Sequence, residues 1–185
     1  MDEVSKMSDD PAIVLTSARP DELPEFVRRL QEAFSAAYRE HFHTEGTVPS
    51  DDDVWSSLKE EGAEVLQIYN EDDLVGGTVV VIDPQTNHNS LDLLFISPEF
   101  HNRRLGSATW RAIERRFPET EVWETVTPYF EKRNIHFYVN RCGFQIVEFF
   151  NGHYPDPDRP LGPDEPPEMG EYFRFRKVMK HPGTE

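Results

Sequence analysis

The sequence predicts an α/β domain with three layers, in which a mixed central β-sheet is flanked by helices. Its apolar residues change repeatedly between the three- and four-residue spacing of helices and the short β-branched runs of strands. The resulting order is one strand, two helices, three strands, a helix, a strand, a helix and two strands. A chain of 185 residues is the usual size of one domain, and it can bury most of its apolar surface without disulfide bonds.

The N-terminal part predicts one strand and two helices. Residues 12–15 are a short apolar run, which we interpret as the first strand. Pro20 then begins a helix whose apolar side chains recur at three- and four-residue steps as far as Tyr38. Ser50 is a typical N-cap residue, and it begins a second, shorter helix over residues 51–61.

A hairpin and a further strand follow these helices. Residues 65–69 and 74–82 have the composition of strands, and the polar segment 70–73 between them predicts a turn. Residues 91–96 form a continuous apolar strand that only Asp92 interrupts. A strand of this kind is typical of the buried centre of a sheet.

Two helices and one strand come next in the chain. A helix over residues 105–117 is stopped by Pro118, and residues 122–126 predict a fifth strand. The last helix runs over residues 131–141, and Gly143 is the residue type expected just beyond its end.

The chain closes with two strands, over residues 144–150 and 172–179. The connection between them, residues 151–171, contains six prolines and several acids, so we expect a stiff, irregular loop. Residues 1–10 are polar and charged without periodicity, which predicts a disordered acidic tail before a single domain over 11–185.

The charge of the chain bears on its partners. It carries 19 Lys and Arg against 35 Asp and Glu, which gives a formal net charge of −16. This excess of acid disfavours nucleic acid as the main partner, because phosphate contacts need Lys and Arg. It is compatible with a cationic substrate and equally with solubility alone.

The composition disfavours several other classes of protein. The lone Cys142 excludes an intrachain disulfide framework and a cysteine-based zinc cluster, and the seven histidines form no recognisable ligand set, so no metal is expected. No apolar run approaches the ~18–20 residues of a membrane span, and the N-terminus lacks the apolar core of a secretory signal. We therefore expect a soluble, cytoplasmic protein.

The junction between strand 91–96 and the following helix carries the strongest local signal. It contains Arg103, Gly106 and Ala108, and the stretch 99–116 has a net charge of +3 within this acidic chain. Helix starts carry unpaired backbone N–H groups and the positive end of the dipole, so this junction predicts a phosphate site. The alternative is an ordinary helix start followed by a solvated arginine face.

Two motifs give the chain a resemblance to a known family. Arg103-x-x-Gly106-x-Ala108 resembles the acetyl-CoA signature of the GNAT N-acetyltransferase superfamily. The segment 134–144, in which Phe137-Tyr138 precedes Gly143-Phe144, resembles a later helix of the same family. The predicted order of elements also matches that of the family from residue 12 to residue 179.

This resemblance implies where an acyl-CoA would bind. In the family, two central parallel strands splay apart and the cofactor lies between them; here these would be strands 91–96 and 122–126. The pantetheine arm would pair with the first strand near a bulge, which we expect at Leu94, Phe95 and Ile96. Asn134 is a candidate for a further contact, or packs within its own helix. The pyrophosphate would bind the N–H groups at the helix start, beside Arg103: those of Arg104, Leu105, Gly106, Ser107 and Ala108.

The resemblance also implies direct acetyl transfer from the thioester to an amine. Tyr138 matches the tyrosine that often gives a proton to the departing thiolate, and its alternative role is a simple contact with the sulfur. For the base that deprotonates the amine, Glu124 is the first candidate, Asp92 the second and a chain of water molecules the third. A backbone N–H near the bulge would stabilise the oxyanion.

The expected donor is acetyl-CoA, and the expected acceptor is a small, cationic primary amine. The acids of loop 151–171 would attract such an amine, or form an ordinary solvated surface. Alternative functions are acetylation of a protein N-terminus or lysine, and a non-catalytic acyl-CoA-binding module. The alternating strand 173–176 could mediate a homodimer or be half-buried in its own sheet.

Overall fold

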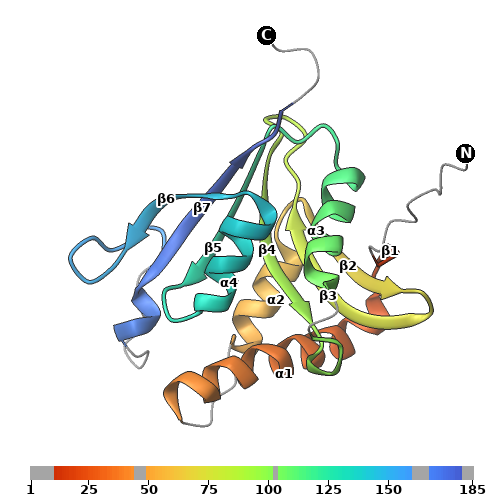
Figure 1. Cartoon of the computed structure of the whole chain (residues 1–185), viewed down its shortest axis with the longest axis horizontal. Coiled ribbons are helices and arrows are strands. Elements are labelled where there is room, and N and C mark those ends of the chain that lie inside the picture. The colour runs from red at the N-terminus through yellow and green to blue at the C-terminus, as the bar shows by residue number, and fades with distance from the viewer. Residues whose placement is uncertain (1–10, 44–48, 102–103, 160–166, 181–185) are drawn as a thin grey trace, which may run out of the picture.

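The computed structural model describes residues 11–43, 49–101, 104–159 and 167–180 (Figure 1). The predicted N-terminal tail, residues 1–10, lies outside the described residues. So does the middle of the proline-rich connection, residues 160–166.

The predicted three-layer α/β architecture is confirmed. One seven-stranded sheet has the order β1-β2-β3-β4-β5-β7-β6, and every pair of neighbours is antiparallel except β4 and β5. The strands are β1 Ile13–Ser17, β2 Ala63–Asn70, β3 Asp73–Val81, β4 His88–Ile96, β5 Val122–Pro128, β6 Gln145–Phe150 and β7 Tyr172–Val178.

Helices cover both faces of the sheet. On one face, apolar side chains of α1 and α2 form a cluster with Val79 of β3 and Phe95 of β4. On the other face, α3 and the turn that follows α4 pack against Leu91 and Trp123. The helices are α1 Leu23–Phe42, α2 Asp51–Lys59, α3 Leu105–Arg116 and α4 Lys132–His136, with 3-10 turns at Pro20–Glu22, Pro98–Phe100 and Pro167–Gly170.

The predicted helix over 131–141 is divided in the structure. Its first part is α4, and its second part is the π-helical turn η3, Phe137–Cys142, which Gly143 ends in the left-handed conformation with φ 78°. Isolated π-helical turns are rare and are found frequently at functional sites. The turn belongs to the segment that carries the second motif.

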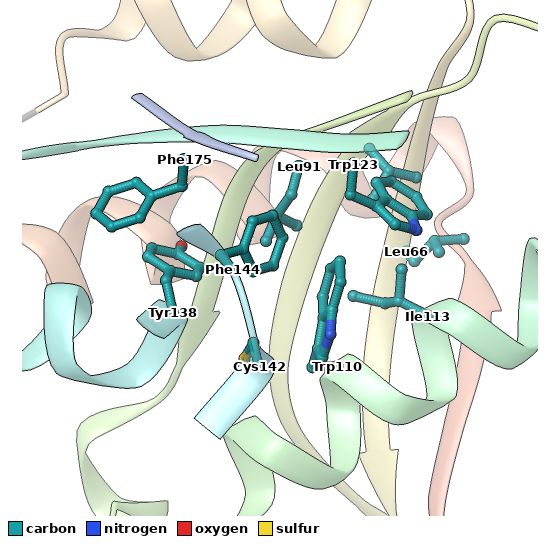
Figure 2. Close-up of a cluster of buried hydrophobic side chains, with 10 residues drawn as sticks. Leu66, Leu91, Trp110, Ile113, Trp123, Tyr138, Cys142, Phe144 and Phe175 are labelled. Carbon is teal, nitrogen blue, oxygen red and sulfur yellow. The ribbon is translucent and has the colours of Figure 1, made fainter. Parts of the chain in front are cut away.

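The largest core lies between the sheet and α3. Trp110 of α3 and Trp123 of β5 are buried and meet edge to face, with ring centroids 5.4 Å apart (Figure 2). Cys142 is buried in the same core, and burial raises the pKa of its thiol to about 12. Because the thiolate is the reactive form, Cys142 acts as an apolar packing residue.

The strand order bears on the two roles expected for segment 173–176, which were a homodimer contact and a half-buried strand of its own sheet. β7 lies between β5 and β6, so the alternating segment Phe173–Arg176 is an interior strand, and β6 forms the edge of the sheet. Phe175 is fully buried whereas Arg176 is exposed, which is the half-buried pattern. β7 therefore has no free edge on which a second copy could pair.

Candidate functional site

The two parallel strands at the centre of the sheet separate soon after they begin. β4 and β5 pair only from His88–Val122 to Ser90–Glu124. Beyond these pairs, β4 continues to Ile96 and β5 to Pro128, and they move apart (Figure 1). One edge of β4 is therefore left without a neighbouring strand, and an extended ligand can pair with it.

A side chain holds the point at which the strands separate. The Thr125 hydroxyl donates a hydrogen bond to the Leu91 carbonyl over 2.7 Å, one residue beyond the last backbone pair. Thr125 is buried, so this bond is shielded from water. We call this point the fork: Leu91 and Thr125, with the divergent strand segments beyond them.

A β-bulge lies at the fork, but not at the predicted residues. Val80 is opposite Leu91 and Val79 is opposite Leu93, so Asp92 is the extra residue. The expectation of a bulge at Leu94–Ile96 was wrong by two residues. The reason is the side-chain phase: Leu91 packs on the α3 side and Leu93 on the α1 side, which strict alternation along a strand forbids.

Of the three residues expected to meet the pantetheine arm, one has a buried side chain and two have half-buried side chains. Phe95 is buried and meets the ring of Phe26 edge to face at 5.4 Å. Leu94 and Ile96 pack against the cluster that contains Leu105 of α3. Pairing with an extended chain uses backbone groups, and beyond Ser90 those on the β5 side of β4 have no strand partner.

The start of α3 is unlike that of α2. Helix α2 has Ser50 as a cap and three aspartates in its first turn, whereas α3 begins after Arg104, with φ 59°, and has neither a capping side chain nor an acid there. The N–H groups of the first turn of a helix lack intrahelical partners. This helix start is thus able to accept an anion, although Arg103 lies outside the described residues.

Gly106 has a neighbour that the sequence did not reveal. A Cβ atom at this position would lie 3.1 Å from the ring of Phe137 in η3. The glycine therefore allows α3 to pack closely on the π-helical turn, in addition to any approach of a ligand. Leu105 and Ala108 beside it are buried, and Ser107 is half-buried.

Tyr138 reaches the fork from η3. Its ring is buried and packs against Phe144 and Phe175 (Figure 2). Its phenol is hydrogen-bonded to Thr125 at the fork. Burial raises the pKa of Tyr138 well above its usual value, so the phenol keeps its proton.

Asn134 lies one helical turn before Tyr138, on α4, and is half-buried. Its contact with the cofactor stays a prediction.

Asp92 has a partner that the sequence did not predict. The Ser90 hydroxyl donates to the Asp92 carboxylate over 2.6 Å, and Glu60, at the end of α2, shares a hydrogen bond with Asp92. Burial, and then the charge of Asp92, raise the pKa of Glu60. The two carboxyl groups thus form a pair in which the charge of Asp92 favours the protonated form of Glu60.

Glu124 lies at the fork in a different setting. Successive residues of a strand face opposite sides of the sheet, so Glu124 points away from Trp123 and Thr125. Its carboxylate accepts a hydrogen bond from Nε of Arg176 over 2.7 Å and lies 2.6 Å from Nη2. Any proton transfer to Glu124 competes with this ion pair.

The described part of the proline-rich connection forms a hollow of about 380 Å³ beside β6 and β7. The carboxylate of Asp156 is buried there and accepts from the Tyr172 phenol over 2.6 Å, which lowers the pKa of Asp156. Arg174 forms ion pairs with Glu148 at 2.9 Å and with Asp156 at 3.4 Å. The hollow is lined by Glu148, Phe150, Tyr154, Pro155, Asp156, Pro157, Asp158 and Arg174.

Within the described residues, no three His, Cys, Asp or Glu side chains gather closely enough to hold a metal ion. In the same part of the chain, no helix is both long and apolar enough to cross a membrane.

A sheet that opens between two parallel strands, beside an acid-free helix start, defines an acyl-CoA-dependent acyltransferase fold. The model of the acetyltransferase (GNAT) family matches residues 25–144, which is more than half of the chain. The chain belongs to this family and carries a GNAT acetyltransferase domain.

Known proteins resemble the chain in sequence and in fold. "Uncharacterized protein YrkN" of Bacillus subtilis (strain 168) is 48% identical over 95% of this chain and 98% of its own length. The ribosomal-protein-S18-alanine N-acetyltransferase of Escherichia coli has a TM-score of 0.66 at 13% identity, covering 93% of this chain and 97% of its own. The spermidine N-acetyltransferase of Vibrio cholerae, in complex with CoA and spermine, has a TM-score of 0.61 at 11% identity, covering 90% and 95%. At such identities the two structures show a shared fold.

The packing of Gly106 predicts the outcome of Gly106→Val. The added methyl groups would overlap Phe137, so we expect a loss of stability of roughly 1–3 kcal/mol, measured by urea unfolding. Gly152→Val is the control, because a Cβ there meets nothing within 4 Å. Equal stability of the two variants would contradict the packing role.

The acid pair predicts a pH-dependent gain in Glu60→Gln. Since the pKa of Glu60 is raised above its ordinary value of 4.5, the folded state loses stability as the pH rises through the raised pKa. Glu60→Gln removes that loss, so its Tm should exceed that of the wild type by about 1–2 °C at pH 8 and match it at pH 4. The neighbouring Glu61→Gln makes the same charge change and should show no such gain, and equal behaviour of the two variants would exclude the pair.

Proposed function

We propose that this protein transfers the acetyl group of acetyl-CoA directly to a small, cationic primary amine. One observation carries the proposal: a proton donor and a proton acceptor reach the fork from opposite faces of the sheet. Tyr138 lies on the face covered by α3, and the Asp92–Glu60 pair lies on the face covered by α2. Acyl transfer to an amine requires both groups, one for the departing thiolate and one for the attacking amine.

The donor side of the site fits an acyl-CoA. The acid-free start of α3 would hold the diphosphate through its backbone N–H groups, and the unpaired edge of β4 would bind the pantetheine arm as an added strand. The CoA complex of the Vibrio cholerae enzyme, which has the same fold, supports this assignment. The thioester would then lie near the bulge at Asp92, where a backbone N–H can stabilise the oxyanion.

In the reaction, a bond forms between the amine nitrogen and the acetyl carbon, and the bond from that carbon to sulfur breaks. Tyr138 donates a hydrogen bond to the sulfur as negative charge develops on it. A thiol has an ordinary pKa of about 8.5, far below that of the buried phenol, so complete transfer of the phenolic proton is uphill. We therefore assign to Tyr138 the role of a hydrogen-bond donor that stabilises the leaving thiolate.

The amine must lose a proton, and we assign its acceptance to the Asp92–Glu60 pair. Glu60 is a stronger base than an ordinary carboxylate, because its pKa is raised. Asp92 is the nearer of the two to the fork. Glu124, the first candidate from the sequence, is engaged by Arg176. A pair of carboxyl groups also attracts an ammonium group before its deprotonation.

The charge and size of the hollow beside β6 and β7 support this choice of acceptor. The hollow beside β6 and β7 has a volume of about 380 Å³, within the range of small-molecule sites. Three carboxylates and a single arginine line it, together with the rings of Phe150 and Tyr154. Such a lining favours a cation with an apolar portion, for example an alkyl or aryl amine.

A panel of amines tests the function through release of free thiol from acetyl-CoA. We expect release that depends on a small cationic amine and weakens as salt is added, because the attraction to the acids is screened. Release only with peptide N-termini or lysine side chains would show that the acceptor is a protein and not a small amine. Binding of acetyl-CoA without release for any amine would make the protein a non-catalytic module.

The assignment of Tyr138 predicts the effect of Tyr138→Phe. The ring and its packing remain while the donor is lost, so turnover should fall by roughly 10²-fold with little change in the Kd for acetyl-CoA. Tyr69→Phe is the control, because its hydroxyl bonds to Gln67 on β2, away from the fork. Full activity of Tyr138→Phe would remove the residue from the chemistry.

The assignment of the base predicts which limb of the pH–rate profile changes. We expect Asp92→Asn to lower kcat/KM by roughly 10²-fold and to flatten the acidic limb, because the group that must be deprotonated is gone. Glu124→Gln should keep the limb of the wild type. If Asp92→Asn kept the acidic limb of the wild type and Glu124→Gln changed it, the base would be Glu124.

A further inference from the structure

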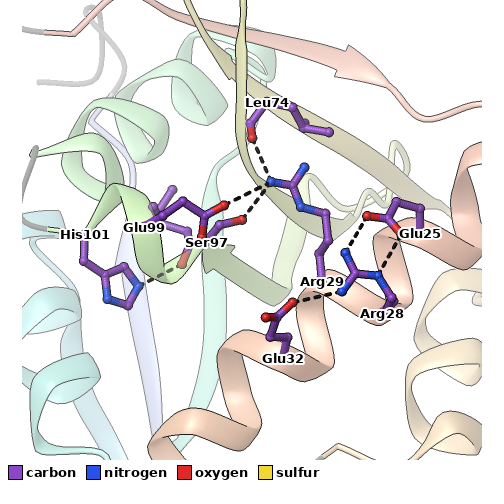
Figure 3. A network of polar contacts seen from close by, with 9 residues as sticks. Glu25, Arg28, Arg29, Glu32, Leu74, Ser97, Glu99 and His101 are labelled. Carbon is purple, nitrogen blue, oxygen red and sulfur yellow. Dashed lines mark hydrogen bonds and ion pairs between the residues drawn. The ribbon is translucent and has the colours of Figure 1, made fainter.

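A largely buried arginine joins α1 to the end of β4. The side chain of Arg29 is only 17% exposed. Its Nη2 donates to the Leu74 carbonyl over 2.9 Å and to the Ser97 hydroxyl over 3.1 Å, and lies 3.7 Å from the Glu99 carboxylate (Figure 3). One guanidinium thus binds three acceptors from two separate parts of the chain.

These contacts lie where β4 leaves the sheet. The ladder between β3 and β4 reaches Ile96, and one further bond runs from the Ser97 N–H to the Val75 carbonyl. The carbonyl of Leu74, one residue earlier on β3, receives Arg29. Arg29 thus ties β3 to the side chain of Ser97, one residue beyond the end of β4.

The anchored segment leads into the predicted phosphate site. Ser97 is buried and is followed by the 3-10 turn Pro98–Phe100. Phe100 packs in the cluster of Leu105, the first residue of α3, and the His101 ring bonds to the Ile96 carbonyl over 2.8 Å. Phe100 therefore connects the anchored segment to the first residue of α3 through side-chain packing.

We propose that Arg29 is a positioning residue for the diphosphate site at the start of α3. By holding Leu74, Ser97 and Glu99 together, it fixes the segment that packs, through Phe100, against the first residue of α3. All three contacts are made by Nη2, whose two N–H groups can bond to Leu74 and Ser97 together while the charge of the guanidinium attracts Glu99. The inference rests on the proposed function, since it takes CoA to be the ligand of the α3 start.

The neighbouring Arg28 provides a matched control. It lies on the same helix, but its side chain is 60% exposed and bonds to Glu25 and Glu32 of α1 itself (Figure 3). Arg28→Gln removes one positive charge from the same region without touching Ser97. A difference in the Kd for CoA between Arg29→Gln and Arg28→Gln therefore reflects the position of the side chain and not the loss of one charge.

The experiment is calorimetric titration of CoA and of pantetheine, which lacks the phosphates, into the wild type, Arg29→Gln, Arg29→Lys and Arg28→Gln. We expect Arg29→Gln to raise the Kd for CoA about tenfold, Arg29→Lys to raise it less, and Arg28→Gln to leave it unchanged. The Kd for pantetheine should stay the same in all four proteins. Thermal unfolding of each protein checks that it is folded.

Two results would overturn the inference: an unchanged Kd for CoA in folded Arg29→Gln, or equal weakening of CoA and pantetheine, which would indicate a general structural role. If Arg29→Gln fails to fold, Ser97→Ala removes only the hydroxyl partner and should weaken CoA selectively by about threefold. Equal binding of CoA by Ser97→Ala and the wild type would then count against it. Failure of the wild type to bind CoA would instead contradict the proposed function.

Discussion

The separation of β4 from β5 is the constraint on which the site depends. Parallel pairing ends at Ser90–Glu124, and the hydrogen bond from Thr125 to the Leu91 carbonyl closes the fork without joining the strands again. A fully paired β4 would satisfy its own edge and leave nothing for a ligand to bind. Beyond the fork, β4 is paired with β3 on one side and has no strand on the other, so an extended ligand can pair with it inside the sheet.

The bulge at Asp92 connects packing to chemistry. Two cores, one under α1 and one under α3, both need leucines from β4, and one extra residue lets Leu91 and Leu93 serve opposite faces. The residue that is left over is an acid, and it meets Glu60 on the α2 side. Tyr138 lies on the opposite side of the fork, where its ring packs against other aromatic side chains. The same irregularity that satisfies both cores thus separates the candidate proton acceptor from the candidate donor.

The order of the elements and two parts of the candidate site could be predicted from the sequence, because they depend on local patterns. Periodicity gave the order of strands and helices, and the two motifs located the start of α3 and Tyr138. Contacts between distant segments could not be predicted in this way. The Glu60–Asp92 pair requires the docking of α2, and the Arg176–Glu124 pair requires the insertion of β7 between β5 and β6. The position of the bulge depends on how two cores compete for one strand, and no single window of sequence contains that information.

The central claim is that the open edge of β4 binds the pantetheine arm of CoA as an added strand. Amide hydrogen exchange, followed with and without CoA, tests it most directly. The account predicts that CoA slows exchange in the segment 92–96 of β4 and in the first turn of α3, while the amides of β2, paired on both sides, are unchanged. Exchange in β4 that CoA leaves unaltered, although it binds, would contradict the account.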